Sequence, residues 1–136
     1  MKIVFDTNCL LRIIPKKSPY RCLWESFLSC KFNLCFTTEI LQEYEEILSC
    51  FYSPKIAEFT LGTLVKAPNT FQIAPYFKWN LIYADPDDNK FVDCAFNAGA
   101  DYIVTNDKHF NMLKSHDFPQ VKVIDIDTFK KIISTD

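Results

Sequence analysis

The segment DPDDNKFVDCAFNAGADYIVT, at residues 85–105, carries the clearest local structure signals in this chain of 136 residues. Its opening DPDD is typical of a helix start, because Asp precedes Pro and acidic side chains in the first turn complement the helix dipole. Apolar residues then recur with helical spacing as far as Gly99, a natural helix end. The run from Asp101 to Thr105 is rich in β-forming residues. The segment therefore predicts a helix that leads into a strand.

The same alternation of helix and strand continues on both sides of this segment. Further strands are predicted at residues 2–5, 33–36, 71–73 and 122–125. Further helices are predicted at residues 7–14, at about residues 20–30, from an N-cap at Thr38 through apolar positions to Leu48, from Pro54 to about Lys66, and at residues 127–133. Alternating strands and helices indicate an α/β fold, with a parallel sheet covered by helices on both faces. The chain length suits one domain over residues 1–136.

Composition and charge narrow the class of protein. Hydrophobic residues make up 49% of the chain, which supplies a substantial core and excludes a disordered chain. The net charge of -2 offers no general basic surface, so a nucleic-acid backbone would need a local basic rim or metal ions. Asp6 and Arg12 interrupt the apolar N-terminus, which is therefore neither a signal peptide nor a membrane span. We expect a cytoplasmic protein with reduced thiols and no membrane contact.

Six cysteines are present without any CxxC pair, and this spacing disfavours a zinc site. Four of them lie among apolar residues and are expected to behave as small core side chains. These four are Cys9, Cys22, Cys30 and Cys94.

Acidic residues follow the predicted strands in a way that suggests a common site. In parallel α/β sheets the active crevice lies beyond the carboxyl ends of the strands. Asp6 directly follows the first strand, Asp107 follows the strand that ends at Thr105, and Asp88 opens a helix whose N-terminus normally faces the same edge. Asp88 also points along the apolar stripe of its helix, where an isolated charge is costly to bury. Glu43 lies at the margin of the apolar stripe of its own helix.

Each of these acids also has a purely structural interpretation. Asp6 could cap the helix that follows it, Asp88 could serve only the helix dipole, and Asp107 could be a turn residue. Glu43 could be one more solvated helix glutamate. The convergence of four acids on one rim favours a shared role. Clustered carboxylates raise one another's pKa unless a cation is present, and Mg²⁺ or Mn²⁺ prefers oxygen ligands. Such a cation also supplies the positive charge that a phosphate backbone requires.

Four stretches of the chain resemble the PIN domain family, in order and over nearly the whole length. The similarity is greatest to the subgroup described as toxin components of toxin–antitoxin systems. The stretches are IVFDTN at residues 3–8, TEILQEYEEIL at residues 38–48, DPDDNKF at residues 85–91 and ADYIVTND at residues 100–107. The resemblance implies a three-layer α/β/α fold with a central, mainly parallel five-stranded sheet.

The resemblance also implies a Mg²⁺- or Mn²⁺-dependent ribonuclease with defined site residues. The catalytic and metal-binding acids would be Asp6, Glu43, Asp88 and Asp107. Asn8 and Thr105 match polar positions that support such a site. Asp93 is a further candidate, although it follows Asp88 by roughly 140° around the helix, which turns it away from the site. The implied partners are an RNA substrate, a small antitoxin over the acidic cleft and a second copy in a homodimer.

The hypothesis at this point is metal-assisted hydrolysis of a phosphodiester. Six basic residues are available to contact phosphates around the rim, although ordinary surface charge explains them equally well. They are Arg12, Lys16, Lys17, Arg21, Lys90 and Lys108. A phosphatase with an aspartyl nucleophile is disfavoured, because Asn8 occupies the position where that chemistry needs a second acid. A non-catalytic RNA- or protein-binding module that retains the fold is left open.

Overall fold

The computed structural model describes residues 1–74, 89–108, 110 and 122–135. Its centre is a five-stranded sheet in the order β3-β2-β1-β4-β5, and all of its pairings are parallel. The strands are β1 (Lys2–Phe5), β2 (Asn33–Phe36), β3 (Thr70–Gln72), β4 (Tyr102–Val104) and β5 (Val123–Ile124). The predicted parallel five-stranded sheet is therefore confirmed.

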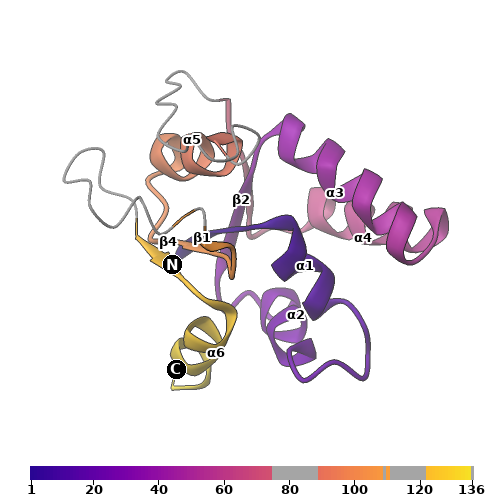
Figure 1. Cartoon of the computed structure of the whole chain (residues 1–136), viewed down its shortest axis with the longest axis horizontal. Helices are drawn as coiled ribbons and strands as arrows, with labels where there is room; N and C mark the ends of the chain where they lie inside the picture. The colour runs from indigo at the N-terminus through magenta and orange to yellow at the C-terminus, as the bar shows by residue number, and fades with distance from the viewer. Residues whose placement is uncertain (75–88, 109, 111–121, 136) are drawn as a thin grey trace.

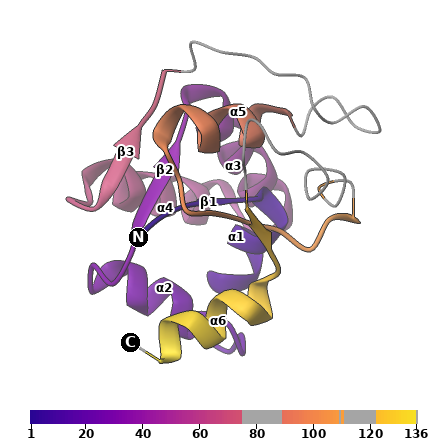
Figure 2. The same ribbon diagram turned by 90° about the vertical axis from the view of Figure 1, so that its left-hand side faces the viewer.

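Helices cover both faces of this sheet. They are α1 (Thr7–Ile13), α2 (Arg21–Leu28), α3 (Thr38–Phe51), α4 (Pro54–Lys66), α5 (Asn89–Ala98) and α6 (Ile126–Ser134). Figure 1 shows α5 on one side of the sheet and α2 with α6 on the other, and the rotated view in Figure 2 agrees. Helices α3 and α4 pack against each other, and α3 also contacts α1 and α5. This arrangement confirms the three-layer α/β/α fold.

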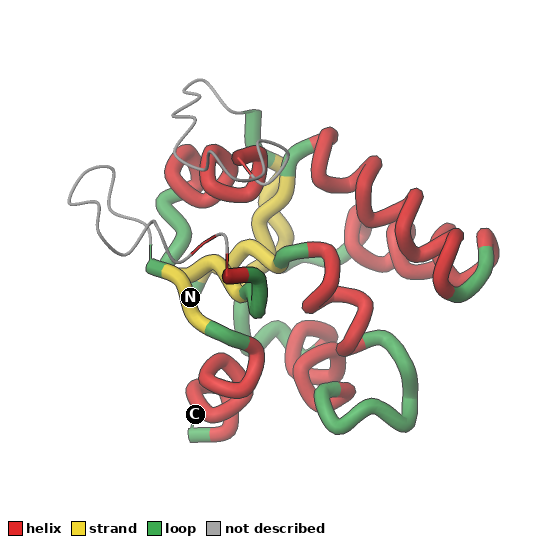
Figure 3. Tube along the Cα trace, viewed as in Figure 1, coloured by secondary structure: helices red, strands yellow, loops and turns green. Residues whose placement is uncertain are grey.

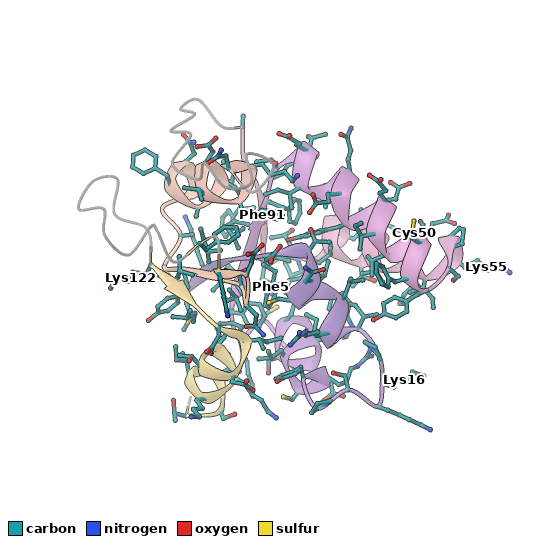
Figure 4. All side chains as sticks on the ribbon, viewed as in Figure 1. Phe5, Lys16, Cys50, Lys55, Phe91 and Lys122 are labelled. Atoms are coloured by element: carbon teal, nitrogen blue, oxygen red, sulfur yellow. The ribbon has the colours of Figure 1, made fainter. Side chains whose placement is uncertain are left out.

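The central strand is buried on both faces, which is typical of a parallel sheet. Ile3 and Val4 are fully buried, and Phe5 is 1% exposed. Phe5, Phe32 and Phe129 meet edge to face, with ring centroids 5.1–5.9 Å apart. Figure 4 shows Phe5 in the interior, whereas the labelled lysines project from the periphery. The aromatic core thus fixes the end of β1, the strand that leads into the candidate site.

Two helix ends show how well local signals predicted the boundaries. Gly99 ends α5 at a φ of 64°, the left-handed conformation that glycine adopts without penalty, as the sequence predicted. The N-cap of α3 is Thr37 and not Thr38, because the Thr37 hydroxyl accepts a hydrogen bond from the Ile40 amide at 3.1 Å. Two adjacent threonines are equivalent as capping residues in sequence, so only the backbone conformation distinguishes them. Most of the other predicted elements are shifted by one or two residues at their ends.

The cysteines are distributed differently from the sequence expectation. Cys9, Cys35 and Cys94 are buried, and we refer to them as the buried thiols. Cys22 and Cys30 are exposed, so their predicted core positions are wrong. Cys22 lies on the outer side of the amphipathic helix α2, and Cys30 follows the end of that helix with a φ of 60°.

Within the described ranges, no helix is long and apolar enough to cross a membrane.

Candidate active site

The strand order brings the ends of β1 and β4 together. Strands β2 and β3 extend to one side of β1, and β4 and β5 extend to the other, so the chain changes direction between β1 and β4. At such a switch point, the carboxyl ends of the strands form a crevice. The Asp6 amide donates to the Val104 carbonyl at 3.0 Å, which joins the two strand ends directly. Figure 3 shows the paired strands and helix α1 beginning where β1 ends.

Thr105 connects two of the predicted acids. Its hydroxyl donates to Asp6 Oδ2 at 2.8 Å and accepts a hydrogen bond from the Asp107 amide at 3.0 Å. Thr105 is 3% exposed and Asp6 is 6% exposed, so this connection is shielded from solvent. The structure therefore connects Asp6 and Asp107 through Thr105, and the supporting role of Thr105 in a functional site stays a prediction.

Electrostatics at Asp6 oppose a permanent negative charge. Burial raises the pKa of the Asp6 carboxyl, and the charges of Asp107 and Glu43 raise this pKa further. The hydrogen bond from Thr105 acts in the opposite direction by stabilising the ionised form. Asp6 makes no side-chain capping bond to α1, although it precedes that helix. A capping role therefore does not explain why an acid is present at this buried position.

Glu43 reaches the site from α3 but is already bound by two partners. Its Oε1 lies 2.7 Å from Lys90 Nζ of α5, and its Oε2 accepts a hydrogen bond from the Thr7 hydroxyl of α1. The next residue, Tyr44, donates from its hydroxyl to the Phe5 carbonyl at 2.5 Å and thereby ties α3 to the end of β1. Glu39, Glu45 and Glu46 of the same helix are exposed, whereas Glu43 is half-buried. A solvated surface glutamate is thus a poor description of Glu43.

A pocket of about 780 Å³ opens at the rim. Its lining includes Asp6, Asn8, Arg12, Lys17, Asn106 and Asp107. Asn8 is exposed on α1 and therefore contributes its side chain to the pocket wall. Among the six basic residues considered from the sequence, Arg12 and Lys17 line this pocket. Lys16 and Arg21 line a separate, mainly apolar pocket, and Lys90 is paired with Glu43.

Two of the predicted acids are associated with α5. Asp88 lies outside the described residues, which resume at Asn89, so its role in the site stays a prediction. Asp93 is 5% exposed and is flanked by Val92 and Cys94, which are fully buried. The sequence turned Asp93 away from the site, by roughly 140° around the helix from Asp88. Because α5 packs against both the sheet and α3, this direction leads into the interior, and a role of Asp93 in the site stays a prediction.

The chemistry of the donors fits a hard divalent cation. Asp6 and Asp107 offer carboxylate oxygens, which Mg²⁺ and Mn²⁺ prefer. A cation between them would also relieve the repulsion that raises the pKa of Asp6. Within the part of the chain that the structure describes, no three acidic, histidine or cysteine side chains lie close enough to hold a metal. Among the described residues, Asp6 and Asp107 alone would therefore supply only part of the ligands of such a cation.

Three residues beside the predicted acids make contacts that the sequence did not indicate. Thr7 and Lys90 orient Glu43, and the Asn106 side chain accepts a hydrogen bond from the Ile126 amide at 3.1 Å, which anchors the start of α6. Thr7 and Asn106 each adjoin a predicted site residue in sequence, which is the signal that could have found them. Lys90 was considered only as a phosphate contact. Its pairing with Glu43 depends on the packing of α5 beside α3.

Comparisons with known proteins agree with this fold. A search of curated protein sequences found no match. One similar solved structure is that of VapBC2 from Rickettsia felis, bound to a DNA fragment from the VapBC2 promoter. The two chains are 16% identical, and the match covers 92% of this chain and 98% of that chain, with a TM-score of 0.61. The PIN domain endonuclease Utp24 is 16% identical, with coverages of 91% and 84% and a TM-score of 0.53. A sequence profile described as PIN domain matches residues 2–109. That match spans most of the chain and includes all four predicted acids, so the chain belongs to the PIN domain family, and this membership supports a nuclease.

Proposed function

We propose that this protein is a metal-dependent endoribonuclease that hydrolyses RNA phosphodiesters. The observation that carries the proposal is the connection from Asp6 through Thr105 to Asp107 at the switch point of a PIN domain. It combines a buried carboxyl of raised pKa with a second acid at the wall of an open pocket. A carboxyl in such a position is stabilised in its ionised form by a bound cation.

The chain's own residues have distinct roles in this proposal. Asp6, Asp88 and Asp107 would hold one or two Mg²⁺ or Mn²⁺ ions, and Glu43 would either bind a second ion or orient the attacking water. A bound divalent ion supplies an activated water and neutralises charge on the phosphate. Thr105 keeps the Asp6 carboxyl oriented towards the crevice. Asn8 offers an amide group at the pocket wall, where a phosphate oxygen or the attacking water can be positioned.

The pocket favours an RNA strand whose bases are unpaired. Arg12 and Lys17 provide cations for backbone phosphates beside the acids. Tyr20, Phe51 and Tyr52 line the same pocket, and aromatic rings stack on unpaired bases. The Tyr20 hydroxyl donates to Asp127 at 2.9 Å and the Tyr52 hydroxyl donates to a backbone carbonyl at 2.6 Å, so both rings are held in place. Single-stranded RNA is therefore the substrate class that we propose.

A cytoplasmic toxin of a toxin–antitoxin pair is the biological role that we propose for this activity. The similar fold of VapBC2 motivates that role. Phe51 is 68% exposed and lines the pocket that contains Asp6 and Asp107, so a partner that covered the pocket would contact its ring. A small antitoxin that covers the pocket would bury Phe51, and a homodimer would be the expected form of the nuclease. Purification from the native host tests this role, because a toxin should bring a small partner with it.

Cleavage of a fluorescently labelled single-stranded RNA tests the activity. The wild-type protein with Mn²⁺ should cleave it, and EDTA should prevent cleavage. Asp6→Asn should lower the single-turnover rate by about 100-fold or more, because it removes a charge at the reacting centre. Glu58→Gln on the exposed face of α4 removes the same charge elsewhere and should leave the rate unchanged. Equal RNA loss with EDTA, with Asp6→Asn and with the wild type would remove the nuclease assignment.

A non-catalytic RNA- or protein-binding module is the second candidate. The observation that favours it is the engagement of Glu43 by Lys90 and Thr7, together with the lack of a three-acid cluster among the described residues. The same assay separates the two candidates. Binding of the labelled RNA without any Mn²⁺-dependent cleavage would support the binding module.

A further inference from the structure

The ion pair between Lys90 and Glu43 adjoins the candidate site, because Glu43 also accepts a hydrogen bond from Thr7, the residue next to Asp6. Lys90 Nζ lies 2.7 Å from Glu43 Oε1, and the side chains are 12% and 28% exposed. Lys90 Nζ also lies 5.5 Å from the centroid of the Phe91 ring. Such a pair is screened by water much less than a surface pair, so its charges influence any ion that binds nearby.

Both carboxylate oxygens of Glu43 are engaged in this arrangement. The Thr7 hydroxyl donates to Oε2, and Lys90 contacts Oε1. These partners come from α1 and α5, so two helices packed around α3 determine the orientation of Glu43. A divalent cation that bound Glu43 directly would lie beside the Lys90 ammonium, and like charges in a partly buried site repel. The arrangement therefore opposes direct metal binding by Glu43.

We propose that Lys90 is a positioning residue whose ammonium replaces a second metal ion. In this arrangement the site binds one divalent cation through Asp6 and Asp107, and Glu43 stays outside direct coordination. This inference rests on the proposed metal-dependent function and specifies its stoichiometry. Lys90 balances the charge of Glu43, so the acidic rim needs fewer cations than its number of carboxylates suggests.

Titration of the metal-free protein with Mn²⁺ tests the proposal, with isothermal calorimetry and the electron paramagnetic resonance of free Mn²⁺ as readouts. The wild type and Lys90→Arg should each bind one ion. Lys90→Met preserves the chain length without the charge, and it should bind a second ion or bind Mn²⁺ about tenfold more tightly. Glu43→Gln should still bind one ion, with a Kd within about threefold of the wild-type value. Asp6→Asn should lose binding.

Each other outcome overturns the inference. Two ions bound by the wild type, a Glu43→Gln variant as defective as Asp6→Asn, or a Lys90→Met variant identical to the wild type would each do so. Thermal unfolding in EDTA shows whether each variant is folded. Should Lys90→Met fail to fold, the wild-type stoichiometry, Lys90→Arg and Glu43→Gln still decide the question.

Failure of this inference is distinguishable from failure of the proposed function. A wild type that cleaves RNA with two bound ions loses only the role given to Lys90. A wild type that binds no Mn²⁺ and cleaves no RNA loses both.

Discussion

The Thr105 hydroxyl makes two hydrogen bonds in the candidate site, and Thr105→Val should lower the free energy of unfolding by about 2–3 kcal/mol at pH 7. The bond to the Asp6 carboxylate at 2.8 Å should contribute about 1.5–3 kcal/mol, because its acceptor is charged. The bond from the Asp107 amide at 3.0 Å is a neutral one and adds about 0.5–1.5 kcal/mol. Water recovers part of the second contribution, since Asp107 is half-buried.

The pH dependence of this loss follows from the pKa of Asp6. Because burial raises that pKa in the folded protein above 3.8, the contribution of Asp6 to stability is fully present below pH 3.8 and is lost as the pH rises through the folded value. The Thr105 bond opposes the loss by favouring the ionised form. Removing this bond raises the pKa further, so the destabilisation in Thr105→Val should be larger at pH 7 than at pH 4.

Urea unfolding in EDTA, at both pH values, measures these free energies. Thr105→Ser is the matched control, because it retains the hydroxyl and loses one methyl group at a cost of about 1 kcal/mol. A difference between the Val and Ser variants below about 0.5 kcal/mol at pH 7 would refute the reasoning, since the two hydrogen bonds would then contribute less than the predicted value of about 2–3 kcal/mol.

Three further predictions concern the core around the site. Tyr44→Phe should lower the free energy of unfolding by about 1 kcal/mol, because the Tyr44 hydroxyl bonds to the Phe5 carbonyl in the interior. Tyr52→Phe removes an exposed hydroxyl hydrogen bond and should lower that free energy by less. Equal losses in urea unfolding would contradict the burial argument. In the native protein, three cysteines should react rapidly with a thiol reagent and the three buried thiols slowly, whereas six rapid reactions would contradict the fold. Burial raises the pKa of Cys9 from 9.0 to about 12, so its contribution to stability is fully present below pH 9 and should be lost between pH 9 and 12, by about 1.4 kcal/mol per pH unit. Burial also raises the pKa of Cys35 and of Cys94, so the total slope above pH 9 should be steeper. Urea unfolding between pH 9 and 10 measures this slope, and Cys9→Ala should reduce it by about 1.4 kcal/mol per pH unit.

Local patterns in the sequence predicted the elements and their parallel arrangement. The helix stop at Gly99 is a conformational property of a single residue. Helical spacing predicted α3, and it also separated Glu43 from the more exposed Glu39 and Glu46. Asp6 and Asp107 were identified as site residues because each follows a strand, and the carboxyl ends of parallel strands share one edge. The predictions of the helix stop and of α3 are confirmed, because they depend on neighbours within a few residues. The roles of Asp6 and Asp107 in a functional site stay predictions.

Only the tertiary structure decided how distant residues meet. The bond between Thr105 and Asp6 spans 99 positions and exists because β4 pairs directly with β1, an order that periodicity does not encode. The pairing of Lys90 with Glu43 likewise depends on the packing of α5 beside α3. The sequence alone thus determined which residues end strands and which line a helix face, because backbone preference and hydrophobic spacing are local. The partners of each charged side chain were decided by strand order and helix packing, which arise only when the whole chain buries its apolar surface together.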